Sequence, residues 1–354
     1  MIGAVSGSSD PRATARAAFA SALAGFDRSR PVTVLGHFDA DGLSAVTILV
    51  RALRTVGWAA TPRITGKGET PWDEPLAAEL RANTPGGLIV TDLGTRAEPV
   101  LPGVPTIVID HHLPTGEAAG ATVISGNGLD PEPTSALLAW WCAAALGDQA
   151  DLLWLAALGL IGDMAPPFPE QAQAEARWGK TALKDAVSLV NAPRRTAAAD
   201  AAPALALLLR GDGPKVVTKE PSPERDALVA AKAEVRDAVE AARRVPPRVQ
   251  GDVALIRFDS PCQIHPLIAQ QWRGRLKDKI VLAANTGYRP GWVHFAARSA
   301  TRRNLVDFLA DHRPAGADGR YGNGHAQATG GALTIPDWNA FVSGLGFPDQ
   351  QVPA

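Results

Sequence analysis

The stretch Val32-Thr-Val-Leu-Gly-His37-Phe-Asp39-Ala-Asp41-Gly42 begins as a short β-branched run and ends in histidine and carboxylates. Two later stretches repeat this plan. Gly87-Leu-Ile-Val90 leads into Thr-Asp92-Leu-Gly, and Thr106-Ile-Val-Ile109 leads into Asp110-His111-His112. Runs this short and this apolar are typical of strands that are covered on both faces, as in a parallel sheet.

Helical patterns separate the first two of these runs. Residues 43–56 place apolar side chains at helical spacing, and a second helical stretch, 74–81, precedes the second run. Strand, helix, strand, helix, strand in this order predicts a doubly wound parallel sheet of the α/β class.

The length of 354 residues favours two domains over one. Residues 224–244 read as a charged, solvated helix, which we interpret as a connector between domains. A second α/β pattern follows, with strands expected at 253–258, 280–284 and 292–297 and a glycine-rich loop at 321–331. We therefore expect a catalytic domain at 1–190, a helical linker at 191–250 and a smaller α/β domain at 251–354.

Composition narrows the classes of function. The formal net charge of -1 argues against a protein that depends on a broad basic surface to hold long nucleic acid. The two cysteines, Cys142 and Cys262, are too few for a disulfide framework or a thiolate zinc site. The N-terminal segment does not resemble a secretory signal, and the most apolar region is broken by Asp148 and Asp151. We expect a cytoplasmic protein without a membrane span.

Carboxylates and histidines collect where the expected strands end, which is where ligands bind in open α/β sheets. A single aspartate after a strand is unremarkable, because aspartate often caps the next helix. Carboxylates or histidines after three strands predict instead one shared acidic, histidine-rich site. Asp163, in Gly159-Leu-Ile-Gly-Asp163, supplies a fourth carboxylate to Asp39, Asp41 and Asp92. Four clustered carboxylates need cations, and two divalent ions would neutralise them. The mixed oxygen and imidazole set favours manganese, with magnesium, zinc, iron or cobalt as alternatives.

The four motifs HFDADG, DLG, DHH and GLIGD, in this order, resemble those of the DHH phosphoesterase superfamily. The form His-x-Asp-x-Asp-Gly is more similar to the RecJ-like branch than to the pyrophosphatases. A second match lies near the C-terminus, where Gly322-Asn-Gly-His325 and Phe295-Ala-Ala-Arg298-Ser299 are similar to the glycine-rich loop and the Arg-Ser strand of the DHH-associated domain. The middle glycine of that loop is replaced here by Asn323.

This resemblance implies a role for each matched residue. His37, Asp39 and Asp92 would bind one metal, and Asp41, Asp92, His111 and Asp163 the other, so that Asp92 bridges. His112 would face the scissile phosphate, with Asp110 behind the histidines. The second domain would hold the substrate through Arg298, Ser299, Gly322, Asn323, Gly324 and His325.

The function that we expect is hydrolysis of short linear or cyclic dinucleotides, or of very short oligonucleotides, by a two-metal mechanism. The chain is short beside RecJ-type exonucleases and has no evident basic, aromatic groove for a long strand. A RecJ-like single-strand exonuclease and a 3′-phosphoadenosine 5′-phosphate phosphatase are the alternative enzymes. A binding protein without activity is a third reading, which the complete ligand set disfavours. The sequence leaves open RNA against DNA, the polarity of cleavage, and a homodimer.

Overall fold

The computed structural model describes residues 10–353, with the backbone alone at Asn323. Two compact units emerge: Met1–Arg194 with Ala199–Ala230, and Arg195–Ala198 with Ala231–Ala354. The helix expected as a linker is α10 (Pro223–Ala242), which begins in the first unit and ends in the second. The domain limits at 190 and 250 stay a prediction.

The first unit contains a parallel sheet in the order β2-β1-β3-β4-β5. The three strands expected from the sequence are confirmed as β1, β3 and β4. Two further strands, β2 and β5, form the edges of the sheet and were not expected. The bounds are β1 Val32–Gly36, β2 Ala60–Ile64, β3 Gly87–Thr91, β4 Thr106–Asp110 and β5 Ala121–Ser125.

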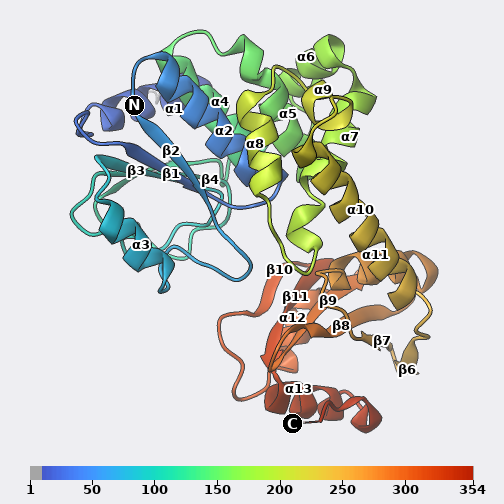
Figure 1. Cartoon of the computed structure of the whole chain (residues 1–354). Helices are drawn as coiled ribbons and strands as arrows, with labels where there is room; N and C mark the ends of the chain where they lie inside the picture. The colour runs from blue at the N-terminus through green and yellow to red at the C-terminus, as the bar shows by residue number, and fades with distance from the viewer. Residues whose placement is uncertain (1–9, 354) are drawn as a thin grey trace, which may run out of the picture. The chain divides into compact units, whose positions relative to one another are not determined.

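Helices cover the two faces of this sheet unequally (Figure 1). One face packs against α1 (Pro11–Leu23), α2 (Ala40–Thr55) and α4 (Ser135–Ala143), and the other packs against the short α3 (Leu76–Asn83). Helix α2 is buried along most of its length because α4, α5 and α8 also contact it. The remaining helices of this unit are α5 Leu153–Gly162, α6 Pro169–Trp178, α7 Lys180–Val190, α8 Ala202–Arg210 and α9 Lys215–Thr218.

The second unit contains a mixed sheet in the order β10-β11-β9-β8-β7-β6, in which only β7 and β8 run parallel. Its three expected strands are confirmed as β7, β8 and β9. The α/β architecture predicted for both parts of the chain is therefore confirmed. The bounds are β6 Arg248–Gln250, β7 Val253–Phe258, β8 Ile280–Arg289, β9 Trp292–Ser299, β10 Tyr321–His325 and β11 Ala328–Thr334.

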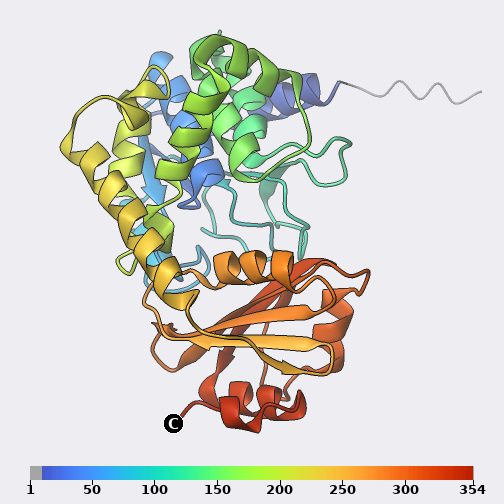
Figure 2. The ribbon, with the colours of Figure 1, turned by 90° about the vertical axis from the view of Figure 1, so that its right-hand side faces the viewer.

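Two apolar layers sandwich this second sheet. Helix α11 (His265–Arg275) and the end of α10 pack on one face, while α12 (Leu305–Asp311) and α13 (Ile335–Gly344) pack on the other. Figure 2 shows α11, in orange, on the face of the sheet opposite the red C-terminal helix.

The prediction of a glycine-rich loop at 321–331 is wrong, because these residues form the hairpin of β10 and β11. Glycine is needed here for close backbone approach. A Cβ at Gly330 would lie 2.4 Å from the carbonyl oxygen of Phe295 on β9, and one at Gly331 would lie 2.7 Å from that of Arg320. The glycines thus fit the strand pairing and do not mark an irregular loop.

Across residues 10–353, no helix combines the length and the apolar character that crossing a bilayer demands.

Candidate metal centre

The first motif lies at the turn from β1 into α2. Asp39 caps α2, and its Oδ1 accepts a hydrogen bond from the backbone N–H of Gly42 at 3.1 Å. Residue 42 must be glycine, since a Cβ there would lie 2.5 Å from the carbonyl oxygen of His37. His37 Nδ1 lies 3.0 Å from Asp39 Oδ2, so the turn brings both side chains to the same point.

Asp41 lies in the first turn of α2 and is fully buried. Its two oxygens accept the backbone N–H groups of Ser135 at 2.8 Å and Ala136 at 2.9 Å. These groups are the start of α4, where the helix dipole favours a negative charge. Helix α4 therefore fixes the carboxylate of Asp41 in place.

Asp92 follows β3 with a left-handed backbone, at a φ of 60°. Aspartate tolerates this conformation better than most residues, and strained backbone of this kind clusters at functional sites. The side chain is buried, and its Oδ1 accepts a hydrogen bond from the hydroxyl of Ser135 at 3.1 Å. The carboxylate of Asp92, like that of Asp41, therefore contacts the start of α4.

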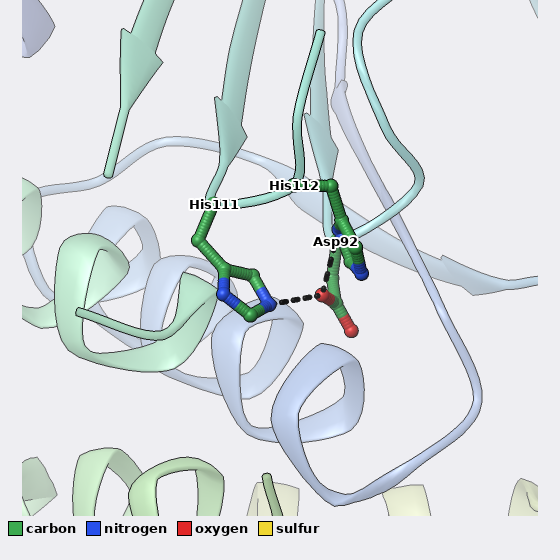
Figure 3. Close-up of side chains that lie close together, drawn as sticks. All are labelled: Asp92, His111 and His112. Atoms are coloured by element: carbon green, nitrogen blue, oxygen red, sulfur yellow. Dashed lines mark ion pairs between the residues drawn. The ribbon is translucent and has the colours of Figure 1, made fainter. Parts of the chain in front are cut away.

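His111 and His112 follow β4 and point toward Asp92 (Figure 3). His111 Nε2 lies 3.6 Å from Asp92 Oδ1, and His112 Nδ1 lies 3.9 Å from the same oxygen. Asp110 is buried behind them and accepts hydrogen bonds from the backbone N–H groups of Gly94 at 2.8 Å and His112 at 2.7 Å. Its Oδ1 also lies 3.0 Å from His112 Nδ1, which holds that ring in place.

Asp163 caps the C-terminal end of α5, and Met164 follows with a left-handed φ of 55°. The N–H of Met164 donates to the carbonyl of Ile161 at 3.3 Å, and that of Ala165 donates to the carbonyl of Leu160 at 2.9 Å. This pair of bonds is a Schellman motif, which fixes the end of the helix. Asp163 Oδ2 then lies 3.4 Å from His111 Nε2.

The structure brings all six sequence-predicted metal ligands into overlapping groups. Their ligand atoms lie within 4.8 Å of one another in three sets: His37, Asp39 and Asp92; Asp41, His111 and Asp163; and Asp92, His111 and His112. Asp92 belongs to two of these sets. Its Oδ2 lies 3.7 Å from His37 Nδ1, while its Oδ1 faces His111, so it is the carboxylate between the two groups.

The electrostatics of this centre fit divalent metal. Burial, followed by the charge of Asp163, raises the pKa of Asp41 to about 7. Burial and the charges of Asp41 and Asp39 raise the pKa of Asp92 well above its usual range. The raised pKa values mean that nearby positive charge is insufficient to stabilise the ionised forms of Asp41 and Asp92. His111 Nε2 is buried among them without a hydrogen-bond partner, as expected for a nitrogen whose natural partner is an ion.

Three residues of this centre were missed by the sequence reasoning. Arg194 Nη1 lies 2.7 Å from Asp39 Oδ2, the Ser135 hydroxyl reaches Asp92, and Glu132 Oε1 lies 3.5 Å from His111 Nδ1. Burial alone would raise the pKa of Asp39, but His37 and Arg194 outweigh it and hold that pKa well below its usual range. None of the three lies in a motif, and only the fold brings them to the metal centre.

The predicted substrate residues lie in the second unit. Arg298 is half-buried on β9 and donates to the carbonyls of Ala297 at 2.9 Å and Thr329 at 3.1 Å. Ser299 bonds through its hydroxyl to Thr301. On the hairpin, Gly322 and Gly324 have φ values of 81° and 139°. The side chain of His325 is exposed, and that of Asn323 lies outside the described residues.

Arg298 borders a pocket of about 470 Å³ within this unit. The pocket also contains His265, His294 and the glycines 330 and 331 of the hairpin. Burial, together with the charges of His294, Arg195 and Arg298, lowers the pKa of His265 to about 3, so this ring is neutral. Ser299 and the β10 glycines do not line the pocket, so the structure joins only part of the predicted set there.

Comparison with known proteins agrees with this architecture. No family model matches the chain. The single-stranded-DNA-specific exonuclease RecJ of Thermus thermophilus is 28% identical over 183 residues, which are 47% of this chain and 26% of that protein. The crystal structure of the same organism's RecJ with Mn²⁺ matches 96% of this chain and 55% of its own, with 23% identity and a TM-score of 0.69.

The solved DHH domain of a protein assigned to a family of ribosomal proteins matches 94% of this chain and 89% of its own, with 16% identity and a TM-score of 0.63. The chain therefore has the fold of the DHH superfamily, as its motifs predicted. The chain is similar to RecJ of Thermus thermophilus in both sequence and fold, although it spans only 26% and 55% of the two Thermus chains compared.

Proposed function

We propose that this protein is a divalent-metal-dependent phosphodiesterase that hydrolyses short linear or cyclic dinucleotides. The observation that carries the proposal is the pair of Asp/His groups at the strand ends, with Asp92 between them. Hydrolysis of a phosphoester is a reaction that two-metal centres commonly serve.

Six side chains would hold the two ions. His37, Asp39 and Asp92 form one site, and Asp41, Asp92, His111 and Asp163 form the other. Two bound ions would lower the pKa of a water and stabilise the charge on the attacking and leaving oxygens. The hydrogen bonds of Asp41 to α4 and of Asp92 to Ser135 keep the ligands oriented before substrate arrives.

His112 would protonate the leaving oxygen. Its Nδ1 faces Asp110, whose hydrogen bond raises the pKa of the ring and so stabilises the protonated form. The other ring nitrogen is left to donate a proton, and the side chain is half exposed and accessible to a ligand. Asp110 acts here through His112 and is a positioning residue.

The second unit would bind the rest of the nucleotide. Arg298 offers a guanidinium at a pocket whose volume of about 470 Å³ suits a small ligand. Ser299 on β9 and Gly322, Asn323, Gly324 and His325 on β10 complete the predicted contacts. The net charge of -1 supports a small anion over a long strand.

A RecJ-like exonuclease on single-stranded nucleic acid is the second candidate. The similarity to RecJ over 183 residues favours it. A 3′-phosphoadenosine 5′-phosphate phosphatase would use the same metal centre on a monoester.

A ladder of substrates separates these candidates. The purified protein with Mn²⁺ is given linear and cyclic dinucleotides, a five-nucleotide RNA, a twenty-nucleotide single strand and 3′-phosphoadenosine 5′-phosphate. We expect turnover of the dinucleotides to be fastest, loss of that turnover in Asp92→Asn, and its retention in Asp212→Asn. Asp212 is a suitable control because its side chain is 94% exposed and belongs to the same unit. Preference for the long strand would favour the exonuclease, and no turnover of any substrate would contradict the proposal.

Manganese as the working ion, a cytoplasmic location and a homodimer stay predictions from the sequence. Thermus RecJ has been solved with Mn²⁺ and with Mg²⁺, so relatives do not single out one ion.

A further inference from the structure

Arg194 places a guanidinium against a carboxylate of the metal centre, with its Nη1 2.7 Å from Asp39 Oδ2. It lies 155 positions from Asp39 in the sequence, in a short 3₁₀ turn, Pro193–Arg195. The preceding Asn191 accepts a hydrogen bond from the backbone N–H of Ala40 at 2.9 Å. The turn is therefore attached to the first motif, and the position of Arg194 beside Asp39 follows from that attachment.

The guanidinium of Arg194 donates a hydrogen bond to the carboxylate oxygen of Asp39 that a metal would use. Asp39 Oδ1 already accepts from Gly42, so Oδ2 is the oxygen directed at the centre. That same Oδ2 lies 2.7 Å from Arg194 Nη1 and 3.0 Å from His37 Nδ1. An ion held by His37 and Asp39 must either share this oxygen with Arg194 or displace it.

The two groups of ligands differ in their net charge. The group of His37, Asp39 and Asp92 has two carboxylates, one of whose charges Arg194 offsets. The other group has three carboxylates, Asp41, Asp163 and the shared Asp92, beside His111. A divalent ion next to a guanidinium is repelled by it in a buried setting, where charges are poorly screened.

We propose that Arg194 weakens metal binding at the His37–Asp39–Asp92 group, so that the two ions bind with unequal affinity and this group fills second. The inference rests on the two-metal centre of the proposed function. Its consequence is that at low metal concentration the protein holds one ion and lacks the second.

Metal titration of the full chain tests this without measuring activity. Isothermal titration calorimetry with Mn²⁺ should resolve two binding constants in the unaltered protein. In Arg194→Gln we expect the weaker constant to tighten at least about ten-fold and the stronger one to stay within about three-fold. Arg194→Lys keeps the charge and should leave both constants near those of the unaltered protein, which separates charge from shape.

Arg51→Gln is the matched control. Arg51 lies in the same unit, its side chain is 22% exposed against 23% for Arg194, and it pairs with Asp212. We expect this variant to leave both binding constants unchanged. If Arg194→Gln does not fold by circular dichroism, Arg194→Met provides a second neutral side chain for the same titration.

Unchanged or weaker Mn²⁺ binding in the neutral Arg194 variants would overturn the inference while leaving the two-metal centre intact. Failure of the unaltered protein to bind Mn²⁺ at all would overturn both. The two failures are therefore distinguishable in one set of titrations.

Discussion

Gly159→Ala is the substitution whose effect the structure defines most sharply. Gly159 lies in α5 where that helix crosses the metal centre. A Cβ added there would lie 2.1 Å from Asp41 Oδ1 and 2.6 Å from the Cβ of Ala136. Ordinary contacts need about 1 Å more, so either α5 or the start of α4 must shift. The shift would break the 2.9 Å hydrogen bond from the Ala136 N–H to Asp41.

The magnitude follows from three contributions. Overpacking a core costs about 1–3 kcal/mol, and leaving a buried polar group unpaired costs about 1–3 kcal/mol more. Replacing a helical glycine with alanine returns about 1 kcal/mol. We expect a net loss of about 1–5 kcal/mol, or a Tm lower by roughly 2–20 °C for a unit of this size.

Thermal unfolding followed by circular dichroism measures this change, and a Mn²⁺ titration reports on Asp41. Gly274→Ala is the control, because Gly274 also lies in a helix, α11, but has open space around the position of a Cβ. That variant should be stable or slightly more stable. A Gly159→Ala protein with an unchanged Tm and unchanged Mn²⁺ affinity would refute the packing that we describe around Asp41.

Three further predictions concern single side chains. Met164→Gly should raise stability by about 0.5–1 kcal/mol in chemical denaturation, because Met164 is 90% exposed and adopts a left-handed backbone that glycine prefers; a loss of stability would contradict this. Glu132→Gln should weaken Mn²⁺ binding by roughly ten-fold in a competition assay, since it removes the carboxylate beside His111 Nδ1, and equal affinity would show that the contact is incidental. His265→Phe should lose less stability in acid than the unaltered protein. In the unaltered protein the unfolded histidine takes up a proton near pH 6.5, while the folded one, with its pKa lowered to about 3, does not. The free energy of unfolding of the unaltered protein should therefore fall by about 2 kcal/mol between pH 7 and 5 because of this histidine. Parallel stability curves for the two proteins over that range would contradict the last prediction.

The central strands could be predicted because burial on both faces gives them a plain sequence signal. The edge strand β2, Ala60–Ile64, contains Pro62 and Arg63 and pairs only with β1, so it lacks that signal. The other edge strand, β5, is only partly buried and was missed for the same reason. The glycines of the β10–β11 hairpin indicated a loop because their cause, the backbone of β9, lies elsewhere in the sequence.

The predicted metal ligands could be found because each follows a strand or ends a helix within a short motif. Asp39 and Asp41 are two residues apart, and the alternation of aspartate with small residues marks the turn. Arg194 had no such signal, since nothing in Asn191-Ala-Pro-Arg194 indicates the packing against Ala40 that places its guanidinium. Glu132 likewise reaches His111 only through the course of the chain between β5 and α4.

Anomalous X-ray scattering from crystals of the full chain grown with Mn²⁺ in excess would locate the bound ions. We predict two manganese peaks per chain about 3.5–4 Å apart, one against His37 and Asp39 and one against Asp41, His111 and Asp163, with Asp92 touching both. A single peak, or peaks away from these side chains, would contradict the two-metal centre.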